Sequence, residues 1–110
     1  MSRTLITVAE TPLFVRQADA VWDDAEREAF VNFIAGDSEA GDLVADTGGV
    51  RKIRWSRAGT GKRGGVRVVY FYHSANRPLY LLMVYAKARK EDLTAAEKRV
   101  MRSLTAVLKA

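Results

Sequence analysis

Four basic side chains and one tyrosine between residues 52 and 87 have the types and spacing needed to act together on a phosphate group. They are Lys52, Arg54, Arg67, Tyr85 and Lys87. Lys52 and Arg54 are two residues apart, as are Tyr85 and Lys87, and alternate side chains of a β-strand share one face. If the strands that carry them pair in one sheet, the five side chains can form a single basic surface that includes an aromatic ring.

Such a surface could cleave RNA without a metal ion. RNA carries its own nucleophile, the 2′-hydroxyl, so cleavage requires in-line geometry, a base, an acid and stabilisation of the pentavalent phosphate. Arginine and lysine can bind the phosphate, and a lysine or tyrosine whose pKa is lowered by cationic neighbours could serve as the base. Metal-dependent nucleases need clustered carboxylates. Residues 47–90 contain none, so we expect neither a metal site nor a cofactor.

A glycine-rich basic loop, GTGKRGGVR (59–67), precedes one of these strands. It fits the pattern G-x-G-x-x-G, but a dinucleotide-binding turn must open a helix, and this loop leads into a strand. A P-loop requires Ser or Thr after Gly-Lys, where this chain has Arg63. Two interpretations stay open: a plain hairpin loop with solvated bases, or a loop that binds phosphates.

Charge is divided unevenly along the chain, whose formal net charge is +5. Residues 1–46 contain ten acids and three bases, residues 47–90 contain eleven bases and no acid, and residues 91–110 contain four bases and three acids. The acid-free block makes one side of the molecule cationic, and the natural partner of such a side is a polyanion. The alternative is a basic surface that serves solubility alone.

Hydrophobic patterns predict the elements that must position these side chains, beginning with a strand and two helices. The β-branched run 4–9 (TLITVA) is typical of a strand. Thr11 before Pro12 predicts one helix start, because threonine caps a helix and proline suits its first turn. Asp23, with Glu26 three residues later, predicts a second start with a capping box.

Three strands and a final helix are predicted after residue 49. Residues 50–55, 66–72 and 79–86 predict the strands, and the short turn 73–78 makes the last two an antiparallel hairpin. These two strands are almost entirely apolar, which is typical of a sheet covered on both faces. Residues 92–110 predict a helix in which Thr94 and Glu97 form a capping box. Its expected apolar stripe consists of Val100, Leu104, Val107 and Leu108.

The predicted order is β-α-α-β-β-β-α in a single α+β domain that spans residues 1–110. The absence of cysteine excludes disulfides and thiolate metal sites. No apolar run is long enough to cross a membrane, and the N-terminal one is too short for a signal peptide, so we expect a cytoplasmic protein. His73 is the only histidine, which excludes a mechanism that needs two.

The segments TGGVRKIRWSRAGTGKRGGVRVVYFY and LYLLMVYAKARKEDLT resemble the RelE/HigB toxins of type II toxin–antitoxin systems. The likeness is greatest to the HigB-like branch, with its pattern GTGG-hydrophobic-RK-R…GKGKRGG-R-hydrophobic-YF. It extends over most of the chain, including ETPLFVRQAD and the last helix.

This resemblance implies a RelE-like, microbial RNase-type fold, in which two N-terminal helices and a C-terminal helix pack on an antiparallel sheet. It implies metal-independent, ribosome-dependent cleavage of mRNA in the decoding site, which inhibits translation. It also implies a cognate antitoxin, expected to be of the helix-turn-helix type. Operator DNA would be bound only through the antitoxin complex.

The family's catalytic residues, carried over by position, are Lys52, Arg54, Arg67, Tyr85 and Lys87. Binding of RNA or the ribosome would fall to Arg51, Arg57, Lys62 and Arg63. After the last strand this chain has KARKEDLT, with no Tyr or His where some family members place a catalytic one. Tyr85 or Lys87 would have to take that role.

Two other functions stay open. One is a non-catalytic nucleic-acid-binding or regulatory module on the same fold; the related ParE toxins, which poison a topoisomerase, show that this fold can serve another target. The other is an interaction protein whose basic face docks an acidic partner.

Overall fold

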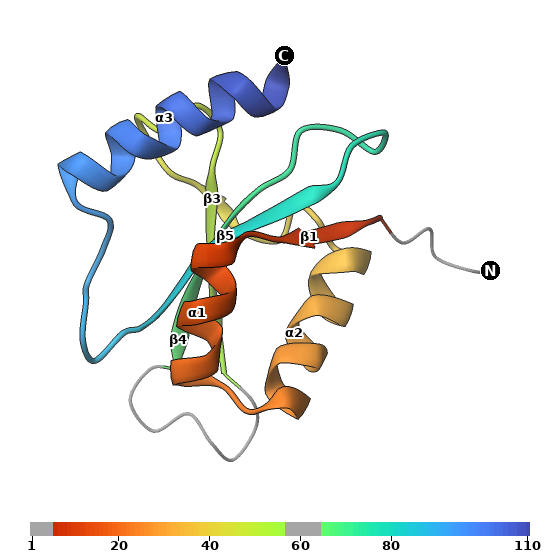
Figure 1. Cartoon of the computed structure of the whole chain (residues 1–110), viewed down its shortest axis with the longest axis vertical. Helices are drawn as coiled ribbons and strands as arrows, with labels where there is room; N and C mark the ends of the chain where they lie inside the picture. The colour runs from red at the N-terminus through yellow and green to blue at the C-terminus, as the bar shows by residue number, and fades with distance from the viewer. Residues whose placement is uncertain (1–5, 57–64) are drawn as a thin grey trace.

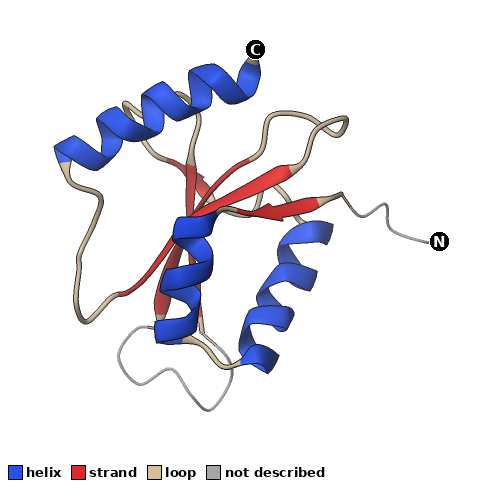
Figure 2. Cartoon of the chain, in the orientation of Figure 1, coloured by secondary structure: helices blue, strands red, loops and turns tan. Residues whose placement is uncertain are grey.

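The computed structural model describes residues 6–56 and 65–110, which form a central sheet with helices on both faces (Figure 1 and Figure 2). The fold is α+β, and its order is the predicted one with a short strand, β2, added. In chain order the elements are β1 (Val8–Glu10), α1 (Pro12–Val21), α2 (Asp24–Gly36), β2 (Asp42–Leu43), β3 (Arg51–Trp55), β4 (Val66–Phe71), β5 (Leu79–Ala86) and α3 (Ala95–Lys109).

The strands form one mixed sheet in the order β1-β5-β4-β3-β2. Neighbouring strands are antiparallel except for β1, which runs parallel to β5 with Val8 opposite Leu79. The expectation of a wholly antiparallel sheet is therefore wrong at this edge. Two helices follow β1, so no tight turn forces it to run antiparallel to its neighbour. β2 was not predicted, because two residues are too few to show an alternating pattern.

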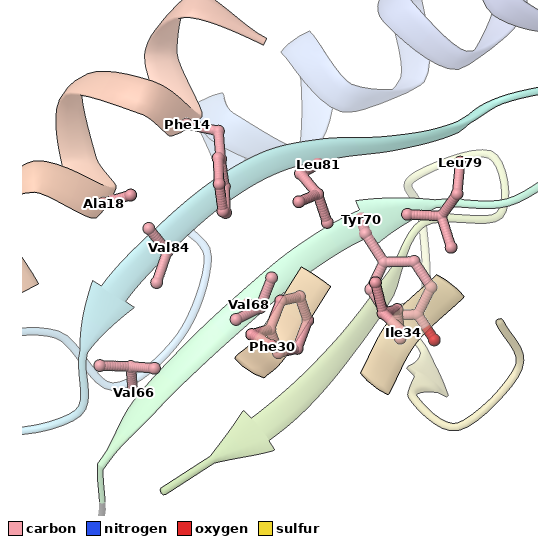
Figure 3. Close-up of a cluster of buried hydrophobic side chains, with 10 residues drawn as sticks. All are labelled: Phe14, Ala18, Phe30, Ile34, Val66, Val68, Tyr70, Leu79, Leu81 and Val84. Carbon is pink, nitrogen blue, oxygen red and sulfur yellow. The ribbon is translucent and has the colours of Figure 1, made fainter. Parts of the chain in front are cut away.

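Two hydrophobic clusters cover the two faces of the sheet, as the apolar strands β4 and β5 predicted. Phe14 of α1 and Phe30 of α2 are fully buried against one face (Figure 3). Met101 of α3 packs against the other. The first cluster also includes Ala18, Ile34, Val66, Val68, Tyr70, Leu79, Leu81 and Val84, and the second includes Val50, Val69, Phe71, Leu82, Met83, Tyr85 and Leu93.

The predicted helix starts are confirmed. Thr11 caps α1 by accepting a hydrogen bond from the backbone N–H of Phe14, and Pro12 occupies the first turn. Asp23 and Glu26 form the reciprocal capping box of α2. Thr94 and Glu97 form the predicted capping box of α3, so this helix begins at Ala95, within the predicted segment 92–110. Local side-chain chemistry thus determines where each helix begins.

The predicted apolar stripe of α3 is only half right. Leu104 and Leu108 pack against the sheet, but Val100 and Val107 are 60% and 71% exposed. Met101 and Thr105 face inward instead. The Thr105 hydroxyl donates to the Thr47 carbonyl at 3.0 Å, so this polar group is satisfied in the core. The inward positions still recur at helical spacing, but the buried face of α3 is rotated away from Val100 and Val107.

Candidate functional site

Strands β3, β4 and β5 bring three of the predicted side chains into line across the sheet. Arg54 pairs with Arg67, and Arg67 pairs with Tyr85. The Cβ atoms of directly paired residues lie about 5 Å apart, and such residues share a face. Tyr85 belongs to the cluster under α3, so all three side chains lie on that face. The expected convergence on one sheet surface is therefore observed for these residues.

A β-bulge in β5 places Tyr85 on this face. Tyr70 of β4 pairs with Leu81 and Val69 pairs with Met83, so Leu82 is an extra residue in β5. Leu82 and Met83 both pack in the cluster under α3, and the alternation of side chains resumes one residue out of phase. Without the bulge, Tyr85 would share a face with Leu81 and point toward α1 and α2.

A cavity of about 420 Å³ opens on the same surface. It is lined by Asp42, Lys52, Ile53, Arg54, Arg67, Lys87 and Glu91. Four of the five predicted catalytic residues therefore surround one space, and Tyr85 adjoins it as the cross-strand neighbour of Arg67. We call this space the phosphate cavity. Arg67 is buried, with 6% of its surface exposed, whereas Arg54 is exposed, so the cavity has a fixed and a freer guanidinium.

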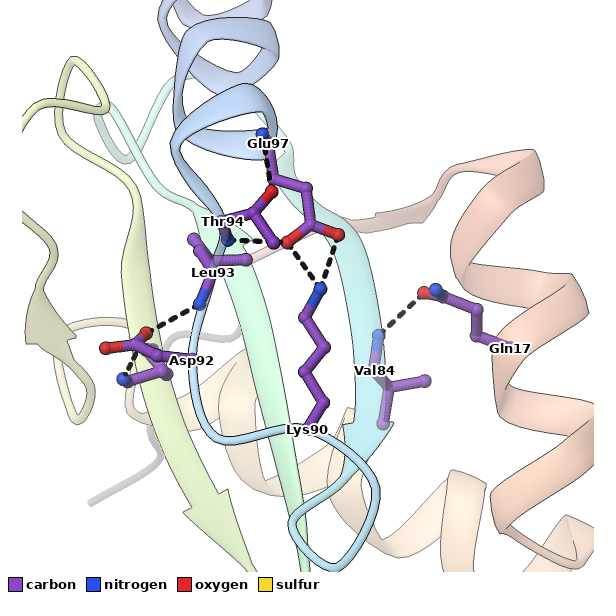
Figure 4. Close-up of polar contacts among 8 residues, drawn as sticks. Gln17, Val84, Lys90, Asp92, Leu93, Thr94 and Glu97 are labelled. Atoms are coloured by element: carbon purple, nitrogen blue, oxygen red, sulfur yellow. Dashed lines mark hydrogen bonds and ion pairs between the residues drawn. The ribbon is translucent and has the colours of Figure 1, made fainter.

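Two carboxylates, which the residue pattern did not single out, hold the lysines of the phosphate cavity. The Lys52 ammonium donates to Asp92 at 2.8 Å, and the Lys87 ammonium forms an ion pair with Glu91. Hydrogen bonds from Lys52 and from the Leu93 backbone N–H lower the pKa of Asp92 (Figure 4). Both acids follow immediately after the acid-free block, which is the one signal that could have found them.

Tyr85 lies in a buried and mostly apolar setting. Burial raises its pKa above the ordinary value, and the Asp92 carboxylate raises it further, while Arg67 lowers it by less. The prediction that cationic neighbours lower the pKa of a catalytic tyrosine is therefore wrong for Tyr85. The neutral phenol is favoured, and a neutral phenol can donate a proton or a hydrogen bond. Lys90, paired with Glu97, places its ammonium 5.5 Å from the centre of the Tyr85 ring.

Of the four side chains predicted to bind RNA, the structure describes only Arg51, and it lies away from this cavity. Arg51 precedes Lys52 on β3 and so points to the opposite face; its guanidinium donates to the Gly41 carbonyl at 2.8 Å and lies 3.7 Å from Glu39. The other three, Arg57, Lys62 and Arg63, lie outside the described residues.

The donor groups of the phosphate cavity indicate an anion site. Its ammonium and guanidinium groups bind phosphate or carboxylate oxygens. Within residues 6–56 and 65–110, no three histidine, aspartate or glutamate side chains are grouped as they would be around a metal ion. Over the same residues, no helix has the length and apolar character needed to cross a membrane.

Comparison with known families agrees with this fold and surface. Residues 13–110 match the family described as the RelE toxin of the RelE/RelB toxin–antitoxin system. The chain belongs to the RelE toxin family. It is thus the toxin component of a toxin–antitoxin system, and this membership implies a cognate antitoxin as its partner. The match does not separate the branches of the family, so assignment of this RelE-family toxin to the HigB-like branch stays a prediction.

Proposed function

We propose that this RelE-family toxin is a metal-independent endoribonuclease that cleaves mRNA on the ribosome and thereby inhibits translation in the cytoplasm. The observation that supports the proposal is the alignment of Arg54, Arg67 and Tyr85 across three strands beside a cavity that also holds two lysines. Two arginines and two lysines outnumber the two carboxylates of the lining, Asp42 and Glu91, and the resulting positive charge attracts a phosphodiester and stabilises its transition state.

In the proposed reaction, the 2′-oxygen bonds to phosphorus as the bond from phosphorus to the 5′-oxygen breaks. Arg67 and Arg54 bind the phosphate oxygens and stabilise the charge that develops on them. The neutral phenol of Tyr85 gives its proton to the departing 5′-oxygen. The base that accepts the 2′-hydroxyl proton is a cavity lysine, Lys52 or Lys87, in its neutral amine form, after it has left its carboxylate partner and lost a proton to solvent.

Inducing the toxin in growing cells and mapping the 5′ ends of mRNA tests this function. We expect new 5′ ends phased with codons, and we expect them to disappear from a message whose start codon is removed. Growth arrest without new 5′ ends would contradict the proposal and favour a ParE-like target. Cuts that persist in the untranslated message would contradict the dependence on the ribosome.

The phosphate cavity also bears on the antitoxin. A partner that neutralises the toxin at this surface should present acids or a docked helix to it. We infer an antitoxin of the helix-turn-helix type, through which the complex binds operator DNA. A neighbouring reading frame that encodes a small helix-turn-helix protein would support this part of the proposal.

Glu91 and Asp92, which pair with the lysines of the phosphate cavity, compete with RNA for them. We predict that the double variant Glu91→Gln/Asp92→Asn binds a single-stranded 2′-O-methyl RNA more tightly, because both lysines then lose their carboxylate partners. Fluorescence anisotropy at several salt concentrations measures the affinity. The control is Asp24→Asn/Glu28→Gln, which removes two exposed acids of α2. Unchanged or weaker binding by the first variant, relative to this control, would show that RNA does not use these lysines.

A further inference from the structure

A second cavity, of about 650 Å³, opens beside the end of β5 and has no role in the mechanism proposed above. It exists because β1 pairs only with Leu79–Leu81, so the second half of β5 is flanked by α1 instead of by a strand. Gln17 of α1 bridges the gap: its side-chain oxygen accepts the backbone N–H of Val84 at 3.0 Å (Figure 4). Val21, Val66 and Val84 contribute apolar wall. We call this space the α1–β5 cavity.

The polar groups of the α1–β5 cavity suit the edge of a nucleobase. The Gln17 oxygen is already used by Val84, so its amide NH₂ is the group left to donate to a ligand. Arg89 and Lys90 also line the cavity, and among the described residues no acid does. Apolar walls with a few convergent polar groups, in a volume of this size, are the usual features of a small-molecule or base-binding pocket.

Tyr85 links the α1–β5 cavity to the phosphate cavity. Val66, which lines the first, and Arg67, which lines the second, are successive residues of β4 and point to opposite faces of the sheet. Tyr85 lines the α1–β5 cavity and pairs directly with Arg67. Within the described residues, the buried hydroxyl of Tyr85 has no hydrogen-bond partner. An RNA strand whose phosphate lies at Arg67 can therefore reach the α1–β5 cavity past Tyr85, along the part of β5 that β1 does not cover.

We propose that the α1–β5 cavity binds one unstacked nucleobase of the RNA, adjacent to the phosphate that is cleaved. The proposal rests on the proposed function. The flat face of the base packs on the valine walls, the Gln17 amide donates to an acceptor on its edge, and Arg89 stacks on the ring or binds the next phosphate. The cavity thereby makes cleavage depend on the base at one position.

Binding can be tested without cleavage. Single-stranded 2′-O-methyl tetranucleotides, either intact or abasic at one position, are titrated into the protein while NMR follows the methyl groups of Val21 and Val84 and the Gln17 side-chain amide. We expect one abasic position to abolish these shifts and to weaken binding at least tenfold. Equal binding by every abasic oligonucleotide, or shifts confined to other residues, would overturn the proposal.

Cleavage sites test the same cavity in cells through two variants. Gln17→Glu keeps an acceptor for the Val84 N–H but removes the NH₂ donor, and Ala20→Trp fills the cavity from an exposed position of α1 that lines it. We expect both variants to lose the base preference at one position next to the cut, with cleavage at other sites retained. The control is Ala25→Trp, at an exposed position of α2 outside the cavity.

The outcomes separate this proposal from the proposed function. If wild-type protein makes no translation-dependent cuts but its valine methyls still respond to the base, the function is wrong and the α1–β5 cavity still binds bases. If both variants cut with the wild-type base preference, the cavity proposal is wrong and the function stands. Loss of antitoxin neutralisation by Ala20→Trp, with an unchanged cleavage pattern, would assign the cavity to the antitoxin and overturn the base proposal.

Discussion

The variant Arg67→Met is expected to lower the rate of mRNA cleavage by about 100- to 1,000-fold, the usual cost of removing one preorganised donor to a transition-state anion. Arg67 occupies the middle of the aligned trio, between Arg54 on β3 and Tyr85 on β5. It is buried, so its guanidinium is held in place before the substrate arrives. Methionine keeps most of the length and apolar surface of the side chain, and the fold should survive. Mapping of mRNA 5′ ends measures the loss, and growth of induced cells reports it independently.

The matched control is Arg16→Met, which removes the same charge from an exposed position of α1. This control should cleave mRNA like the wild type. Arg67→Lys should recover little activity, because an ammonium cannot reproduce the bidentate geometry of guanidinium. Thermal unfolding and binding to the antitoxin check that each variant is folded. A folded Arg67→Met variant with wild-type cleavage would remove Arg67 from the mechanism.

The variant Phe30→Ala is expected to lower the free energy of unfolding by about 3–5 kcal/mol, the range for truncating a buried phenylalanine. Phe30 is fully buried between α2 and the sheet. Its ring centre lies 5.5 Å from that of Trp22 and 5.3 Å from that of Trp55, so truncation removes contacts with both. Urea denaturation, followed by tryptophan fluorescence or circular dichroism, measures the change.

Val107→Ala provides the contrast for this measurement. The sequence pattern places Val107 in the core stripe of α3, whereas in the structure it is 71% exposed. We expect a change of no more than about 0.5 kcal/mol for this surface substitution. A loss of several kcal/mol at Val107 would show that α3 packs through the valine stripe after all. A loss below about 1 kcal/mol at Phe30 would place that ring outside the core.

The elements were predictable because local chemistry decides them. Capping residues such as Thr11 and Asp23 determine where helices begin. The β-branched and aromatic runs of β4 and β5 favour buried strands. The orientation of α3 was less predictable, because two sets of inward positions fit its spacing. The buried hydrogen bond of Thr105 to Thr47 selects one of them, and this contact joins residues 58 positions apart.

The basic residues of the candidate site were predictable, but the β-bulge and the ion pairs that fix their positions were not. Alternation along β3 correctly places Lys52 and Arg54 together, and pairing of antiparallel neighbours brings Arg67 beside them. The bulge at Leu82 is invisible in a strand whose residues are nearly all apolar, although it determines the face of Tyr85. Nor could spacing reveal that Asp92 reaches back across the sheet to Lys52, forty residues earlier.

The central claim is that the basic side chains of β3, β4 and β5 bind the phosphate that is cleaved. Its most direct test is an electron cryo-microscopy structure of the toxin on a translating ribosome, with the decoding-site codon 2′-O-methylated to block the nucleophile. We predict that one mRNA phosphate lies in the phosphate cavity against Arg67 and Arg54, with Lys52 and Lys87 released from Asp92 and Glu91. A bound toxin whose ion pairs stay intact, and whose cavity faces away from the mRNA, would contradict the account.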